Sequence, residues 1–270
     1  MIPIFSKPKI VSEKGNRAVF EIESLYPGYG ITIGNSLRRV LLSSLPGVAV
    51  TKMKIKDVAH EFSTIPGVYE DAIQIMLNLK KLRFKMFSEE PQKAVLKVKG
   101  EKEVKGRDFS LPSQLELVNK DEKVATLTDK KAELEIEIQV EKGIGYMPRE
   151  KRKGEKLSVG EVLVDAIFGP VKKVGYLIEN MRVGDRTDFD RLRIDIETDG
   201  TILPSAALSQ AAEILVQHFS SISQGLVVEE ISAPVKEKTG KQAAGKKKPA
   251  SGPKKKTGPV KKAKAKKRKK

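Results

Sequence analysis

The chain has 270 residues, enough for one large domain or two modest ones with real hydrophobic cores. It has no cysteine and only two histidines, His60 and His218, which excludes disulfides, thiolate zinc sites and cysteine nucleophiles and argues against a histidine metal cluster. The net charge is +17, but residues 236–270 hold 16 Lys, one Arg and one Glu, so residues 1–235 carry only +1.

The first clear pattern is a strand followed by a helix. Residues 18–25 (AVFEIESL) alternate apolar and polar side chains, as a half-buried strand does. Residues 29–45 (YGITIGNSLRRVLLSSL) predict a glycine-punctuated turn and then a helix over 35–45, which Pro46-Gly47 ends. The apolar side chains of this helix form a stripe wider than one small helix needs within its own domain: Leu37, Val40, Leu41, Leu42 and Leu45.

The glycines ahead of this helix have two interpretations. Gly28, Gly30 and Gly34 suggest a phosphate-binding loop, but their spacing is GxGxxxG rather than GxGxxG, and no GK[ST] sequence follows. A turn that needs positive φ explains them more simply. The adjacent Arg38 and Arg39 lie about 100° apart on the helix, so at least one of them is available at a surface.

A strand, a helix and a half-solvated sheet follow. Residues 48–56 predict a strand, residues 60–62 a second short one, and residues 68–82 an amphipathic helix with Lys80 and Lys81 at its cation-favouring C-terminal end. His60 and Glu61 match the first two residues of the zinc-protease motif HExxH, but no second histidine follows at the required spacing. A structural role for His60 is therefore favoured over a catalytic one. Further strands are predicted wherever apolar residues alternate or form a short run: residues 94–98, 115–118 and 134–140.

The last part of the folded region ends in a second apolar helix. Residues 143–148 (GIGYMP) break the preceding strand, and the basic loop 149–156 is typical of a solvated segment. Three strand-like segments then precede a helix that Pro204 opens: residues 162–168, in which Asp165 is the only charge, 174–179 and 192–197. The apolar stripe of this helix consists of Leu208, Ala211, Ala212, Leu215, Phe219 and Ile222. Its small residues would allow another helix to approach closely: Ala206, Ala207, Ala211 and Ala212.

The C-terminal segment has a different composition. From Pro234 onward Lys, Ala, Gly and Pro dominate, and such a segment cannot bury enough apolar surface to offset its ordering entropy. We expect it to be disordered. No apolar run in the chain approaches the roughly 20 residues that cross a bilayer, and the first ten residues lack the apolar segment of a signal peptide. We therefore expect a soluble protein without membrane contact.

Four segments resemble, in order and spacing, the N-terminal region of the bacterial RNA polymerase α-subunit family. They are residues 28–47 (GYGITIGNSLRRVLLSSLPG), 60–82 (HEFSTIPGVYEDAIQIMLNLKKL), 141–148 (EKGIGYMP) and 163–208, which begins LVDAIFGP. The resemblance covers about residues 1–225. It implies an α+β fold with three parts: a discontinuous dimerisation domain of an antiparallel sheet and two helices (1–46 and 176–232), an inserted mostly-β domain (47–175), and a disordered Lys-rich tail (233–270).

The resemblance also implies a function. The chain would homodimerise and form the platform on which the β and β′ subunits of DNA-directed RNA polymerase assemble, with ω and σ in the complete enzyme. It would work in the bacterial cytoplasm, at the nucleoid, without a cofactor or a metal of its own. The dimer interface would be isologous and would use residues from both helices: Leu37, Val40, Leu41, Leu208, Ala212, Leu215 and Phe219.

Four residues match the family's positions at the large-subunit contacts. Arg39 in NSLRRVLLSS matches the arginine associated with β docking, where a planar guanidinium can bind a carboxylate or carbonyls bidentately. Lys80 in LNLKKL, Val164 in LVDAIFGP and Arg182 in ENMRVGDRTD match positions near these contacts.

The sequence offers no set of residues for nucleotidyl transfer. That chemistry needs clustered carboxylates that hold two magnesium ions. The nearest group, Asp185, Asp188 and Asp190, is interleaved with Arg186 and Arg191, which favours internal ion pairs. We therefore expect a non-catalytic chain, and the resemblance assigns the metal-binding carboxylates of the nucleotidyltransferase to β′.

The end of the chain departs from the family pattern, in which a compact helical domain reads upstream promoter DNA. Our hypothesis is that the Lys-rich tail binds upstream DNA phosphates without sequence preference, and the alternative is a solubilising or RNA-binding tail with no promoter role. A rival for the whole chain is a free-standing basic nucleic-acid-binding dimer. The candidate DNA-binding residues are Lys254, Lys255, Lys256, Lys266, Lys267 and Arg268.

Overall fold

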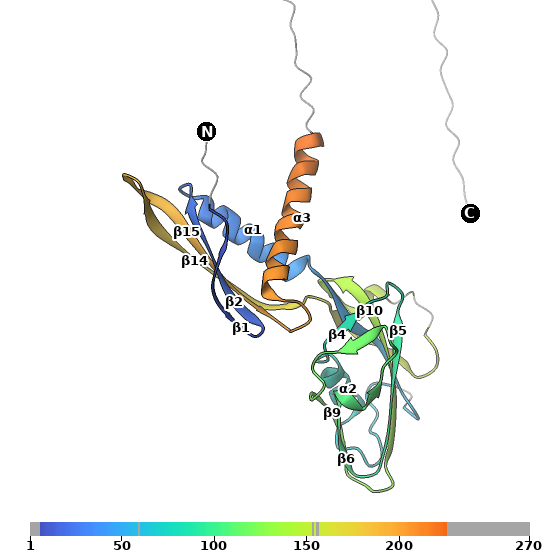
Figure 1. The fold of residues 1–270 in the computed structure, drawn as a ribbon. Coiled ribbons are helices and arrows are strands. Elements are labelled where there is room, and N and C mark those ends of the chain that lie inside the picture. Colours follow the sequence, from blue (N-terminus) through green and yellow to red (C-terminus); the bar gives the residue numbers. More distant parts are fainter. Residues whose placement is uncertain (1–5, 59, 153, 155–156, 226–270) are drawn as a thin grey trace, which may run out of the picture. The chain divides into compact units, whose positions relative to one another are not determined.

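The computed structural model describes residues 6–58, 60–152, 154 and 157–225. Its first layer is an antiparallel four-stranded sheet in the order β1-β2-β15-β14, built from both ends of this range (Figure 1). The strands are β1 (Lys9–Lys14), β2 (Arg17–Leu25), β14 (Val171–Val183) and β15 (Arg186–Thr198).

Two helices cover one face of this sheet. Helix α1 (Tyr29–Ser43) contacts β14 and β15, and helix α3 (Pro204–Gly225) contacts α1, β2 and β15. The shared core contains alternate residues of the central strands together with residues of both helices. Among its members are Phe20, Ile22, Leu192, Ile194, Leu37, Leu41 and Ala207.

A second hydrophobic core belongs to the intervening residues. Its five-stranded sheet has the order β12-β3-β10-β5-β7, and helix α2 (Ala72–Leu79) packs against β3 and β9. The strands are β3 (Pro46–Ile55), β5 (Gln92–Lys99), β7 (Phe109–Ser110), β10 (Glu133–Ile144) and β12 (Glu161–Leu163). Three strand pairs accompany this sheet: β4 (Phe84–Met86) with β8 (Leu115–Leu117), β6 (Lys102–Lys105) with β9 (Lys123–Leu127), and β11 (Tyr146–Met147) with β13 (Ala166–Ile167).

The fold is therefore α+β, as expected, with antiparallel sheets and three α-helices within the described residues. The predicted strands 18–25, 48–56, 94–98, 134–140 and 192–197 are confirmed, as is the helix that Pro204 opens. In addition, the structure contains short strands that have too few residues for a period to be recognised.

The predicted glycine turn ahead of a helix over 35–45 was wrong, because helix α1 already begins at Tyr29. Gly28 is the left-handed residue in front of it, with φ of 84°, whereas Gly30 and Gly34 lie inside the helix. A Cβ atom at Gly30 would lie 2.9 Å from the Asp190 Oδ2 atom, and one at Gly34 would lie 3.0 Å from the Leu192 Cδ1 atom. Both glycines are therefore explained by close packing of the helix on the sheet, and not by a turn.

Three further predictions were wrong. Residues 60–62 form a turn rather than a strand, and α2 is shorter than predicted because it begins only after its N-cap residue Asp71. The Asp71 carboxylate accepts the Gln74 backbone N–H at 2.7 Å, which fixes that start. Residues 143–144 continue β10 instead of breaking it, since Gly143 pairs with Gly47 and Ile144 with Pro46 on β3.

Candidate functional site

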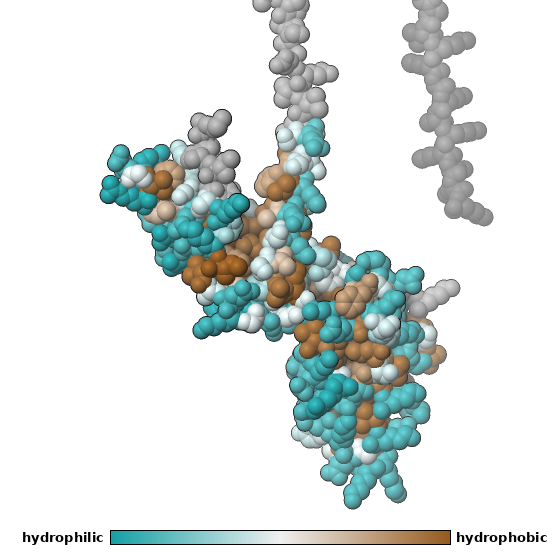
Figure 2. All heavy atoms as spheres, viewed as in Figure 1, coloured by the Kyte–Doolittle hydropathy of each residue, from teal (hydrophilic) through white to brown (hydrophobic). Residues whose placement is uncertain are grey.

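An apolar groove lies between the two helices of the first layer. It has a volume of about 400 Å³, and we call it the α1–α3 groove. Figure 2 shows apolar residues gathered along these helices. The residues that line the groove include Ile33, Leu37, Leu208, Ala212, Leu215 and Phe219.

Helix α3 extends beyond the core that supports it. Its first two turns bury Pro204, Ala207, Leu208 and Ala211, whereas its later turns have no comparable neighbour within the described residues. Three large apolar side chains in these turns are largely exposed: Val216 at 63%, Phe219 at 60% and Ile222 at 59%. Such a concentration of exposed apolar side chains is typical of a surface that meets another protein.

The seven predicted interface residues fall into two groups. Leu37, Leu41 and Leu208 are buried within the chain's own core, although Leu37 and Leu208 also line the α1–α3 groove. The others remain at least partly accessible: Val40, Ala212, Leu215 and Phe219. Sequence periodicity did not single out Val216, because it lies beside the stripe rather than on it.

Asp190 on β15 fixes the N-terminal end of α1. Its Oδ2 atom accepts the backbone N–H groups of Gly28 at 2.9 Å and Gly30 at 3.0 Å. A buried carboxylate at this position satisfies amides that have no partner inside the helix and interacts favourably with the helix dipole. Asp190 therefore holds the start of α1 against the sheet.

Of the ion pairs predicted for Asp185, Asp188 and Asp190, the one between Asp188 and Arg186 is confirmed, whereas Asp190 binds backbone amides and Arg191 faces glutamates. The Arg186 guanidinium donates to both oxygens of Asp188, at 3.0 and 2.7 Å. This hydrogen bond holds the pKa of Asp188 below its usual value. Within the residues that the structure covers, no group of three or more metal-ligating side chains comes together.

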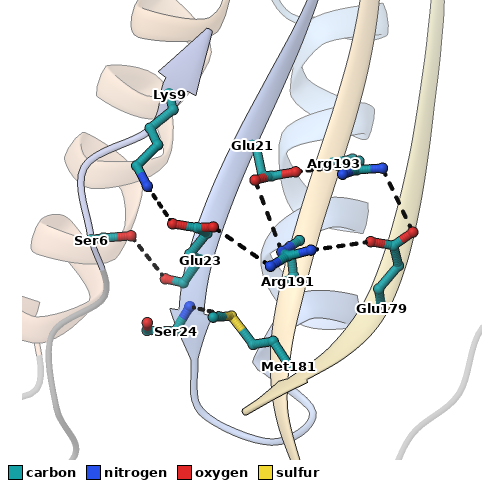
Figure 3. Close-up of polar contacts among 9 residues, drawn as sticks. All are labelled: Ser6, Lys9, Glu21, Glu23, Ser24, Glu179, Met181, Arg191 and Arg193. Carbon is teal, nitrogen blue, oxygen red and sulfur yellow. Dashed lines mark hydrogen bonds and ion pairs between the residues drawn. The ribbon is translucent and has the colours of Figure 1, made fainter. Parts of the chain in front are cut away.

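The opposite face of the four-stranded sheet is charged (Figure 3). Glu21 and Arg193 are cross-strand partners, and the Arg193 Nε atom donates to Glu21 at 2.6 Å. Arg191 lies between three carboxylates, within 3.7 to 3.9 Å of Glu21, Glu23 and Glu179. These groups neutralise one another across the strands, so this part of the sheet surface is a network of paired charges.

Arg39 and Arg182, two of the proposed contact residues, are exposed. Arg39 lies on α1 beside Arg38, and within the described part of the chain neither guanidinium has a hydrogen-bond or ion-pair partner. Arg182 lies on β14, where its Nε atom donates to the backbone oxygen of Gly184 at 2.8 Å. The structure gives no contact between Arg39 and Arg182, which lie on different elements.

The other two proposed contact residues, Lys80 and Val164, are linked through Asp165. The Lys80 ammonium lies 3.6 Å from the Asp165 carboxylate, and Asp165 is next to Val164. The Val164 side chain is itself buried, at 1% exposure, and its backbone N–H donates to the Thr51 carbonyl at 2.9 Å. Val164 therefore anchors the segment that carries Asp165.

Asp165 connects this pair to the basic loop 149–156, which was expected to be simply solvated but whose Arg149 and Arg152 form ion pairs with Glu61 and Glu141. Its Oδ1 atom accepts the Arg149 backbone N–H at 2.9 Å, and the Arg149 guanidinium donates to both Glu61 oxygens, at 2.9 and 3.0 Å. The available signal was a single charge within the apolar run 162–168. His60 lies beside Glu61, and its Nδ1 atom shares a hydrogen bond of 3.1 Å with the Ser63 hydroxyl, which is a structural role.

Two predictions concern other parts of the chain. The candidate DNA-binding residues Lys254, Lys255, Lys256, Lys266, Lys267 and Arg268 lie outside the described residues. Among the helices that are described, none has the length and apolar character needed to span a bilayer.

The chain is similar to known proteins over most of its length. A family model described as the RNA polymerase Rpb3/RpoA insert domain matches residues 53–169. A protein of Roseiflexus sp. (strain RS-1) is 48% identical over 217 residues, which are 80% of this chain and 67% of the relative. A protein of Oceanobacillus iheyensis is 44% identical over 233 residues, covering 85% of this chain and 74% of the relative. Both relatives are named DNA-directed RNA polymerase subunit alpha.

Proposed function

This chain belongs to the family of bacterial DNA-directed RNA polymerase α subunits, and on that premise we propose that it is the non-catalytic subunit on which β and β′ assemble. Two copies pair first, and the pair then binds the large subunits in the cytoplasm, near the nucleoid. Subunits ω and σ join the complete enzyme. In this proposal nucleotidyl transfer takes place on the large subunits.

The observation that supports pairing is the exposed C-terminal half of α3 next to the α1–α3 groove. Three large apolar side chains, Val216, Phe219 and Ile222, are each about 60% exposed. Burying one such side chain fully is worth about 1.5–3 kcal/mol, so leaving all three in water is costly. A second copy of the chain offers an identical helix and an identical groove, and a two-fold axis buries both sets at once.

We also propose that the pairing unit and the inserted unit are separate domains, residues 1–46 with 176–232 and residues 47–175. Their two distinct hydrophobic cores support this division. Val171 and Val174 of β14 pack with the first core and Val164 with the second, which favours a boundary between 164 and 171, a few residues earlier than 175. Each unit then contributes its own contact residues.

Docking of the large subunits is proposed to involve Arg39, Lys80, Val164 and Arg182. Arg39 is the strongest of these four, because its guanidinium is exposed and unpaired within the described residues. An arginine already held by an internal carboxylate would have to give up that partner before it could bind another. Arg39 has no such cost.

The Lys-rich tail is proposed to bind DNA phosphates non-specifically through counterion release. Its support is compositional: residues 236–270 have a net charge of +16 and no aromatic side chain that could stack on a base. The free-standing basic nucleic-acid-binding dimer is less well supported, because relatives named as polymerase α subunits match 80% and 85% of the chain.

Pairing is tested by Phe219→Glu in the full-length chain. A charge at this exposed apolar position costs little in a monomer but much in a buried interface, so we expect the variant to be monomeric at micromolar concentration while the wild type is a dimer. Analytical ultracentrifugation measures both masses. Gln217→Glu is the matched control, because it places the same charge on the opposite side of α3, and it should remain dimeric. A monomeric wild type would contradict the proposal.

A further inference from the structure

Lys80 is held by a partner within its own chain. It is the C-cap residue of α2, its side chain is only 22% exposed, and its ammonium lies 3.6 Å from the Asp165 carboxylate. To bind a partner protein directly, Lys80 would first have to leave Asp165. A direct contact is therefore a poor explanation for a lysine in this position.

Asp165 also binds the backbone of a second segment. While its Oδ2 atom faces Lys80, its Oδ1 atom accepts the Arg149 backbone N–H at 2.9 Å. This bond fixes the start of the short 3₁₀ segment Arg149–Arg152. One carboxylate thus joins the end of α2 to that segment.

The connection continues to the surface through the Arg149 side chain. Its NH1 group donates to both Glu61 oxygens, at 2.9 and 3.0 Å. Glu61 and Arg149 border a depression of about 540 Å³, where the neighbouring Phe62 is 71% exposed. An exposed aromatic side chain beside a fixed arginine is a combination enriched at protein interfaces.

We infer that Lys80 and Asp165 are positioning residues, which hold the Arg149–Glu61 rim of this depression in shape for a large polymerase subunit without touching that subunit themselves. The inference rests on the proposed assembly function. Lys80 neutralises Asp165, Asp165 holds the Arg149 backbone, and Arg149 orients Glu61. Val164 contributes by anchoring the segment that carries Asp165 to β3.

A first experiment needs no partner subunit. Limited trypsin digestion of the full-length dimer measures cleavage after Arg149, which depends on how often this segment opens. We expect Asp165→Ala, which removes both contacts, to be cut about tenfold faster than wild type, and Asp165→Asn, which keeps an acceptor for the backbone N–H, to be cut at an intermediate rate. Lys97→Ala is the control, because it breaks an exposed ion pair with Glu135 on the same inserted unit and should leave this cleavage unchanged. Equal cleavage of Asp165→Ala and wild type would overturn the inference.

A second experiment separates positioning from direct contact. Retention of β and β′ on tagged chains is measured for Lys80→Ala, Asp165→Asn and the double variant. If Lys80 acts through Asp165, each single change lowers retention by about three- to tenfold and the double variant is no worse than either. If Lys80 contacts the large subunit itself, Asp165→Asn leaves retention unchanged and the two effects multiply. That result would overturn the inference.

The two experiments fail in distinguishable ways. If the wild-type chain retains neither β nor β′, the proposed assembly function is wrong. The part of the inference that assigns the Arg149–Glu61 rim to a large subunit is then wrong as well. The trypsin result still decides whether Asp165 holds the Arg149 segment. Circular dichroism melting of every variant identifies any that does not fold.

Discussion

Individual carboxylates hold distant segments of this chain in place, each through a different partner. Asp190 accepts two amides at the start of α1, and Asp165 joins Lys80 to the Arg149 backbone. Glu70, whose side chain is 5% exposed, accepts the Thr126 backbone N–H at 2.6 Å and pairs with Lys123 at 2.9 Å. Buried carboxylates are tolerated when they are paired in this way.

Glu70 makes stability depend on pH. Burial alone would raise the pKa of Glu70, but hydrogen bonds from Lys123 and Thr126 outweigh it and hold the pKa below the usual value. A carboxyl whose folded pKa lies below its unfolded pKa stabilises the fold above the unfolded pKa, and this contribution is lost as the pH falls through the folded value.

We therefore expect Glu70→Gln to lower the free energy of unfolding by about 1–3 kcal/mol near neutral pH and by progressively less as the pH falls below about 4. Urea unfolding of both proteins at several pH values, at one protein concentration, measures the difference. A difference that does not change with pH would show that the charge of Glu70 is irrelevant.

Arg39 is the residue on which proposed β docking depends most directly. Because it is exposed and unpaired within the described residues, Arg39→Ala should leave the dimer intact and lower recovery of β in a pull-down by about tenfold. Arg38→Ala is the natural control, since it removes the same side chain one position away. Equal recovery of β by both variants would refute the assignment.

At the scale of elements, the first layer depends on how closely α1 approaches the sheet. Gly34 faces Leu192 and Tyr176, and a Cβ atom there would lie 3.0 and 3.1 Å from their side chains. Glycine lowers the intrinsic stability of a helix by about 1 kcal/mol relative to alanine, so its presence twice within α1 needs a packing reason. Close approach provides that reason.

Gly34→Val tests this packing. Its branched side chain has no room between helix and sheet, and overpacking of this kind costs about 1–3 kcal/mol in the free energy of unfolding. Asn35→Val introduces the same side chain at the next, exposed position and should change stability by less than about 0.5 kcal/mol. Chemical denaturation of both variants makes the comparison, and equal stabilities would remove the packing explanation.

At the scale of the whole molecule, charge and apolar surface are segregated along the chain. Residues 1–235 are close to neutral and contain the apolar helices, while residues 236–270 carry a net charge of +16. In our proposal the folded part binds protein and the tail binds DNA. Only the second interaction should weaken steeply with salt.

Removing residues 236–270 from the assembled polymerase tests that division. Each phosphate that the tail neutralises adds about 0.9 to the slope of log affinity for DNA against log salt concentration, so the shortened enzyme should show a shallower slope. DNA binding by both enzymes is titrated with salt, with retention of β as the control. Identical slopes would favour the solubilising tail.

Local pattern was enough to predict much of the fold. Alternation of apolar and polar residues predicted the central strands 18–25, 134–140 and 192–197, because a sheet with one solvated face has a period of two. The apolar stripe after Pro204 predicted α3, and the division of charge between folded region and tail is visible from composition alone. These features depend on residues close together in sequence.

Contacts between distant residues were decided only by the tertiary structure. The glycines of α1 resembled a turn until the side chains of β14 and β15 were placed against them, and Lys80 resembled a free helix-end cation until Asp165 was found beside it, 85 positions later. Periodicity gives the face on which a side chain lies but not its neighbour across the core, because that neighbour is set by how elements far apart in the sequence pack.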